Sequence, residues 1–154
     1  MLFLTIPYEI QTVIKNESYL TGKPARQILI EKLRGQTVEK DFSPELKKNM
    51  LKLDEIRSLK RNWNGNHAKS ISGKIVKKTK SLIINLDKQP QIFPTASDSI
   101  QIEYDGENDS YLELQITKGK ELSYYKVDKS GKEITGTIPC SSFALNALVE
   151  DFYE

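Results

Sequence analysis

The sequence predicts an α+β fold, with helices in the first half of the chain and an antiparallel sheet in most of the second half. Two observations predict it. Apolar residues recur at helical spacing up to about residue 87, and from residue 99 they alternate with polar residues, as in strands that bury one face. Short turns rich in glycine, asparagine, aspartate and lysine join the alternating stretches, and such connections favour antiparallel neighbours.

The first 35 residues predict a strand followed by two helices. The strand is expected over residues 1–6, where apolar positions alternate. The helices are expected over residues 8–20 and 24–34, and Gly22 and Gly35 suit their C-terminal caps. The apolar residues expected to be buried in this segment are Leu2, Leu4, Ile6, Ile10, Ile14, Ile28, Leu29 and Leu33.

The rest of the chain predicts a linker and a second domain. Residues 36–42 are polar and aperiodic, so they are expected to link a module of residues 1–35 to a domain of residues 43–154. Ser43 and Pro44 predict the start of a helix that frays by Asn62. A helical pair is completed over residues 72–87, and a C-terminal helix is expected over residues 141–152. Four strands are expected over residues 99–106, 110–119, 121–131 and 132–139.

Alternation in the predicted sheet separates an apolar face from an acidic face. The apolar face comprises Ile100, Ile102, Tyr104, Leu112, Leu114 and Ile116. The other face carries Gln101, Glu103, Asp105, Glu113 and Gln115. This face is predicted to bind a basic protein partner through Glu103, Asp105, Tyr111 and Glu113, with Tyr124 as a further aromatic anchor. A solvated acidic face and a pair of hydrolytic carboxylates are the alternatives.

Charge is distributed unevenly along the chain. Residues 44–90 carry 12 Lys and Arg against 4 Asp and Glu, a net charge of +8. Residues 91–154 carry 5 against 12, a net charge of −7, whereas residues 1–43 carry 6 against 5. Such a division indicates surfaces with different partners, or a basic helical layer and an acidic sheet that are both simply solvated.

Composition also argues against several classes of protein. No apolar run approaches the ~20 residues that a membrane helix needs, and the N-terminus lacks the basic flank of a signal peptide. Cys140 is the only cysteine, which suits a reducing cytoplasm. Because His67 is the only histidine, one chain holds no Cys/His zinc site. No nucleophile, base and oxyanion donor can be named together, so we expect a protein that is not an enzyme and binds no cofactor or metal.

The opening segment resembles the ribbon-helix-helix family of the Arc and MetJ type. The resemblance is carried by the alternating strand that ends at Ile6-Pro7, by Ile10, Ile14 and Ser18 in the first helix, and by Thr21-Gly22 before the second. It implies a homodimer in which two strands pair antiparallel, with the inward-facing residues named above forming the shared core. It also implies operator binding by the outward face of the ribbon, at Phe3 and Thr5, with Lys23 and Arg26 on phosphates.

Two features depart from that family's pattern. The ribbon offers bases one hydroxyl and two apolar side chains rather than Arg, Asn or Gln, and Pro24 lacks the N–H that would hold a phosphate. A module that only dimerises is therefore the alternative.

Residues 59–72, LKRNWNGNHAKSIS, and residues 91–104, QIFPTASDSIQIEY, are similar to uncharacterised bacterial domains encoded beside small toxin or regulatory genes. Trp63 is expected to pack under a turn and His67 to lie in a loop. We expect a cytoplasmic, dimeric regulator of the antitoxin type. The alternatives are an interaction module without DNA binding and, least favoured, a hydrolase.

Overall fold

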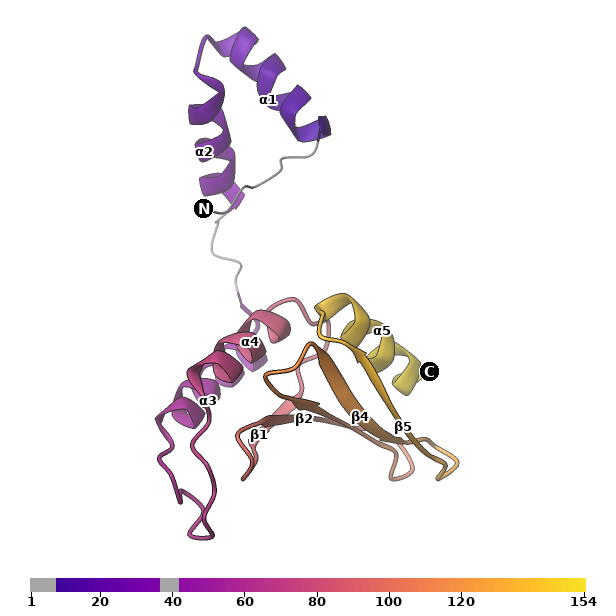
Figure 1. Cartoon of the computed structure of the whole chain (residues 1–154). Coiled ribbons are helices and arrows are strands. Elements are labelled where there is room, and N and C mark those ends of the chain that lie inside the picture. The colour runs from indigo at the N-terminus through magenta and orange to yellow at the C-terminus, as the bar shows by residue number, and fades with distance from the viewer. Residues whose placement is uncertain (1–7, 37–41) are drawn as a thin grey trace. The chain divides into compact units, whose positions relative to one another are not determined.

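The computed structural model describes residues 8–36 and 42–154 (Figure 1). The chain divides into two compact units, Met1–Asp41 and Phe42–Glu154. The predicted strand over residues 1–6 lies outside the described residues. The predicted roles of Leu2, Phe3, Leu4, Thr5 and Ile6 therefore stay predictions. Most of the predicted linker and the side chains of Ile10 and Leu33 lie outside the described residues as well.

Two helices form the described part of the first unit: α1 (Tyr8–Thr21) and α2 (Ala25–Gln36). They lie within two residues of the predicted positions. Gly22 makes the turn between them, because its φ of +69° is in the left-handed region that favours glycine. Its N–H donates to the Ser18 carbonyl at 3.0 Å, which closes the end of α1.

Three helices belong to the second unit: α3 (Pro44–Ser58), α4 (Gly73–Ile83) and α5 (Ser142–Tyr153). Ser43 caps α3 as predicted, since its hydroxyl accepts from the Leu46 N–H at 3.1 Å. Helices α3 and α4 end earlier than predicted. The backbone of Leu59 is extended after α3, and a turn in which the Leu86 N–H donates to the Ile83 carbonyl follows α4.

The sheet of the second unit has five strands rather than the four predicted. They are β1 (Gln91–Pro94), β2 (Ile100–Asp105), β3 (Tyr111–Ile116), β4 (Glu121–Val127) and β5 (Glu133–Pro139). The sheet is an antiparallel meander in the order β1-β2-β3-β4-β5. The missed strand, β1, is only four residues long, follows Pro90 and ends at Pro94, so its sequence has the composition of a loop.

Helices α3, α4 and α5 cover one face of this sheet (Figure 1). Their apolar residues join the apolar face of β2 and β3 in one core, as the alternation predicted. Asn49 of α3 is buried. Its amide donates to the Gln89 side chain at 3.1 Å and to the Pro90 carbonyl at 3.0 Å, just before β1 begins. These bonds satisfy a buried polar group and tie the helix layer to the sheet.

The two edge strands share a feature: each ends in a proline, Pro94 in β1 and Pro139 in β5. In the edge strand β5, Gly136 lies opposite Tyr124 of β4. A Cβ atom at Gly136 would lie 2.7–2.8 Å from atoms of the tyrosine side chain, so the ring occupies the space that glycine leaves.

Candidate partner-binding face of the sheet

The candidate site is the face of the sheet that α3, α4 and α5 do not cover. Strand register places its side chains: Glu103 of β2 lies opposite Glu113 of β3, which lies opposite Tyr125 of β4. We call this surface the open face. Its residues are Gln91, Phe93, Gln101, Glu103, Asp105, Tyr111, Glu113, Gln115, Glu121, Ser123, Tyr125, Val127, Glu133, Thr135, Thr137 and Pro139.

The charged residues of the open face are all acidic. They are Glu103, Asp105, Glu113, Glu121 and Glu133. The ion pairs found among the described residues involve other carboxylates, at Glu17, Glu31, Asp54, Asp98 and Asp151. Lys52 approaches the edge of the face, but its ammonium lies over the ring of Phe93, 4.5 Å from the centroid, rather than on a carboxylate. The negative charge of the open face is therefore uncompensated within the second unit.

Neutral donors hold the central carboxylates in place. The amide nitrogen of Gln101 donates to Glu103 at 2.7 Å and to Glu113 at 3.1 Å, so it bridges two acids that are directly opposite each other. The hydroxyl of Tyr111 donates to the same oxygen of Glu113 at 2.8 Å. Such donors fix the orientation of the carboxylates without cancelling their charge, which leaves them able to receive a cation from a partner.

Two tyrosines stand among these acids. Burial, and then the hydrogen bond to Glu113, raise the pKa of Tyr111 above its ordinary value. Burial and the neighbouring Glu133 raise the pKa of Tyr125. Both hydroxyls thus stay protonated on this half-buried surface, where tyrosine offers a ring and a donor together.

The structure places all four predicted partner-binding residues, Glu103, Asp105, Tyr111 and Glu113, on the open face. The prediction that Tyr124 is a further anchor on this face is wrong. Register sets it opposite Leu114 and Gly136, where it packs against the core, and its neighbour Tyr125 lies on the open face instead. Sequence reasoning also missed Glu121 and Glu133, although period-two alternation continued from β3 into β4 and β5 would have indicated them.

The first unit exposes much of its apolar surface. Of its described apolar side chains, Ile14 and Ile28 are buried within one chain, and Leu29 is partly buried. Five described apolar or aromatic side chains outside the predicted dimer core are exposed instead. They are Tyr8 (78% exposed), Val13 (52%), Tyr19 (91%), Leu20 (82%) and Ile30 (38%).

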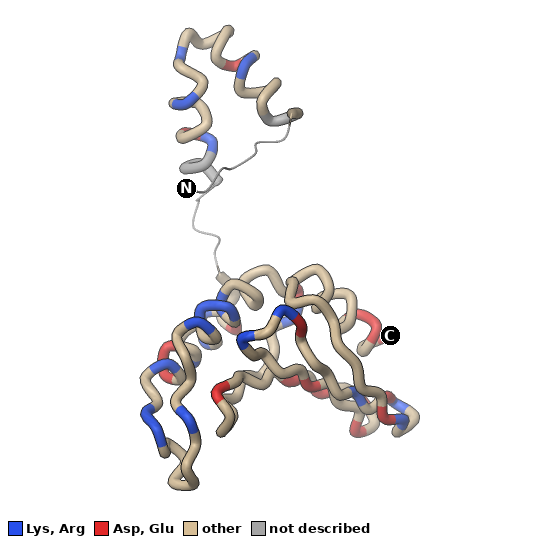
Figure 2. Tube along the Cα trace, viewed as in Figure 1, with Lys and Arg blue, Asp and Glu red and all other residues tan. Residues whose placement is uncertain are grey.

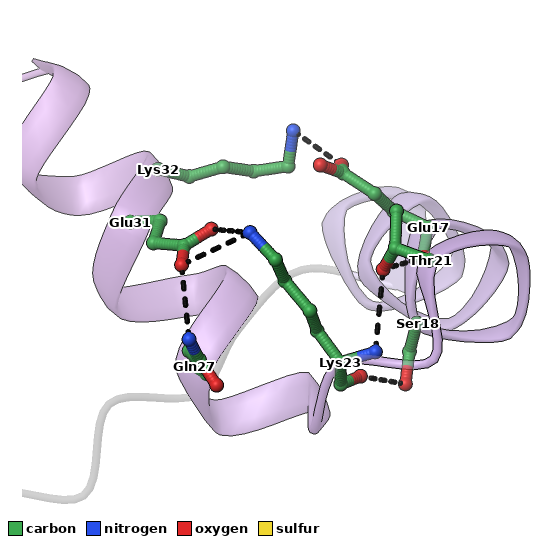
Figure 3. Close-up of polar contacts among 7 residues, drawn as sticks. All are labelled: Glu17, Ser18, Thr21, Lys23, Gln27, Glu31 and Lys32. Atoms are coloured by element: carbon green, nitrogen blue, oxygen red, sulfur yellow. Dashed lines mark hydrogen bonds and ion pairs between the residues drawn. The ribbon is translucent and has the colours of Figure 1, made fainter.

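The predicted phosphate ligands of this unit differ in their surroundings. Lys23 reaches across to α2, where its ammonium lies 3.0 Å from a carboxylate oxygen of Glu31 (Figure 3). Hydrogen bonds from Lys23 and then from Gln27 lower the pKa of Glu31, so that carboxylate stays ionised. A second pair, Lys32 with Glu17 at 2.6 Å, links α2 to α1. Arg26 is exposed too, but it forms no ion pair with a described residue.

Comparison of the chain with protein-family models, with curated proteins and with solved structures gave no match. Among residues 8–36 and 42–154, no helix is long and apolar enough to cross a membrane. The same residues contain no group of three or more His, Cys, Asp or Glu side chains placed to hold a metal ion.

Proposed function

We propose that the protein is a dimeric regulator of the antitoxin type that acts in the cytoplasm. Its second unit binds a basic protein partner, such as a toxin, through the open face. Its first unit pairs two chains and carries the contacts to operator DNA. The observation that supports this proposal best is the set of five carboxylates on the open face, none of them paired with a described cation.

The chemistry of the open face fits a basic partner. Uncompensated carboxylates attract lysine and arginine side chains and speed the encounter with a partner that carries them. Glu103 and Glu113 are held close together by Gln101, so one guanidinium can bond both. Tyr111 and Tyr125 add the aromatic area that interfaces favour at their centres.

Dimerisation is supported by the exposed apolar residues of the first unit. A segment of about 40 residues rarely buries enough apolar surface to be stable alone, and this one leaves Tyr19 and Leu20 largely exposed. A second copy of the same segment would cover such side chains. The proposed dimer follows from this need for burial.

A second candidate function, an interaction module without DNA binding, is favoured by one observation. Lys23 already bonds Glu31, so a DNA phosphate would have to compete with a carboxylate for its ammonium. The two predicted phosphate ligands are Lys23, just before α2, and Arg26, in its first turn. Arg26 is then the stronger phosphate ligand.

Binding of the purified product of the adjoining gene, measured by calorimetry, tests the open face. We expect Glu103→Gln with Glu113→Gln to weaken that binding at least tenfold, and the loss to shrink as salt is raised. Glu45→Gln with Glu55→Gln is the matched control, because it removes two exposed acids from α3. Equal affinity of both double variants would refute the assignment.

Gel shifts with the chain's own promoter DNA separate the two candidate functions. In the presence of excess competitor DNA of unrelated sequence, Arg26→Glu should abolish the operator-specific shift if the first unit binds the operator, whereas Lys15→Glu on α1 should have a much smaller effect. A confirmed dimer that gives no shift at low salt would reject operator binding and leave the interaction module.

A further inference from the structure

We infer that the second unit also binds the phosphate backbone of double-stranded nucleic acid, through the end of the α3–α4 pair where residues 59–72 connect the two helices. This site is independent of the ribbon and of the open face. We call it the basic end and define it by six cationic residues. They are Arg57, Lys60, Arg61, Lys69, Lys74 and Lys77.

The first argument is a long run of sequence without acids. Residues 56–86 contain 8 Lys and Arg and no Asp or Glu. Figure 2 shows these cations along α3, α4 and the loop between them. The last turn of α3 lies next to the first residue of α4: a Cβ atom at Gly73 would lie 3.8 Å from the guanidinium of Arg57.

The second argument is that six of the eight cations have no side-chain partner among residues 8–36 and 42–154. Lys78 donates to the Thr117 and Gly119 carbonyls, and Lys80 bonds Asp54. The side chains of the basic end form no ion pair with a described residue. The carboxylate of Asp98, which accepts from the Ser72 N–H at 2.7 Å, is paired with Lys118 at 3.0 Å. The carboxylate of Asp98 is therefore already paired outside the basic end.

The third argument is that the loop presents donors and hides acceptors. The side-chain carbonyl of Asn62 accepts from the His67 N–H, and that of Asn64 accepts from the N–H groups of Asn66 and Ala68. These bonds occupy the side-chain oxygens of Asn62 and Asn64, so the amide NH₂ groups of these exposed residues remain as donors. Phosphate oxygens accept hydrogen bonds and donate none, so they match such a surface.

The N-terminus of α4 adds to this potential. Ser72 makes no side-chain cap bond, and the first turn of the helix contains no acidic residue. The partial positive charge of the helix end is therefore not offset locally, and it lies beside Arg57 and Lys74. The backbone of the loop is left-handed at Asn62, Gly65 and His67.

A nucleic-acid backbone fits this surface better than a membrane does. Membrane-surface segments insert apolar side chains, but the aromatic residue of the loop is folded back. The indole N–H of Trp63 donates to the Lys69 carbonyl at 2.9 Å, and the residues around it are asparagine, lysine and arginine.

The test is fluorescence anisotropy of a labelled 20-base-pair duplex of arbitrary sequence with the full chain, from 50 to 200 mM KCl. We expect wild-type binding to weaken steeply with salt. Lys60→Gln, Arg61→Gln and Lys69→Gln together should weaken it at least tenfold and lower the salt slope by about 3, because each lost phosphate contact lowers it by about 1. A melting curve like that of the wild type will show that this triple variant is folded.

Two comparison variants locate the effect. Lys48→Gln, Lys120→Gln and Lys132→Gln remove the same charge outside the basic end and should change affinity less than threefold. Lys23→Gln with Arg26→Gln tests the proposed DNA contact of the first unit separately, so the two proposals can fail independently. Equal losses in the two triple variants would overturn the inference, and so would absence of wild-type binding at 50 mM KCl.

Parallel measurements identify the source of the phosphates. Binding of a duplex DNA or a duplex RNA of the same sequence, lost in the basic-end variant, supports the inference and names the polymer. Vesicles of phosphatidylserine and phosphatidylcholine are the competing surface. Binding to vesicles without binding to either duplex would overturn it.

Discussion

Replacing Glu103 by glutamine should stabilise the second unit while weakening the proposed partner binding. Glu103 and Glu113 are directly opposite in adjacent antiparallel strands, a position in which side chains lie about 5 Å apart. Two unit charges at that separation repel by about 0.8 kcal/mol in a water-like dielectric. Glutamine removes the repulsion, and its amide can donate to Glu113. We therefore expect the free energy of unfolding to rise by about 0.5–1 kcal/mol and the Tm by about 2–5 °C.

Urea unfolding followed by the fluorescence of Trp63, the only tryptophan, measures this change. Glu121→Gln is the matched control, because Glu121 lies opposite Pro139 and has no acid facing it. The gain at Glu103 should fall by more than half in 1 M salt, where the screening length of about 3 Å is shorter than the separation. A Glu103→Gln protein no more stable than the wild type at low salt, or a gain that salt does not change, would refute the reasoning.

Three further predictions concern the core. Asn49→Ala should lower the free energy of unfolding by about 1–3 kcal/mol in urea melts, because it leaves the Pro90 carbonyl without its donor. Gly136→Ala should cost about 1–3 kcal/mol by overpacking against Tyr124, but little in a Tyr124→Ala background, where the clashing ring is absent. Burial, and then Tyr153, raise the pKa of Tyr104 above 10.0, so the unfolded chain releases this proton first and stability falls as pH rises above that value. Melts between pH 9 and 11.5 should show a steeper fall for the wild type than for Tyr104→Phe.

Much of the fold was predictable because its signals are local. Ser43 and Gly22 marked helix ends through chemistry that acts within four residues. Alternation over β2 and β3 predicted which side chains enter the core. Strand β1 was missed because its pairing comes from β2, not from its own four residues. Helix α4 was predicted too long because a turn at Ile83, rather than a change in periodicity, ends it.

The candidate site was predictable only where the strand phase was clear. Glu103 and Glu113 belong to strands with strict alternation, so their common face followed directly. In β4, Tyr124 and Tyr125 are adjacent and equally bulky, and only the pairing with β3 shows which one enters the core. The bond between Lys23 and Glu31 depends on how α1 turns into α2, which residue types alone do not specify.

The prolines at the ends of the two outermost strands have a consequence for self-association. Pro94 and Pro139 lack the N–H that an incoming strand would require, which hinders edge-to-edge pairing of the sheets of two molecules. Polymerisation through the meander is thus discouraged at both margins. The proposed pairing of two subunits then depends on the first unit.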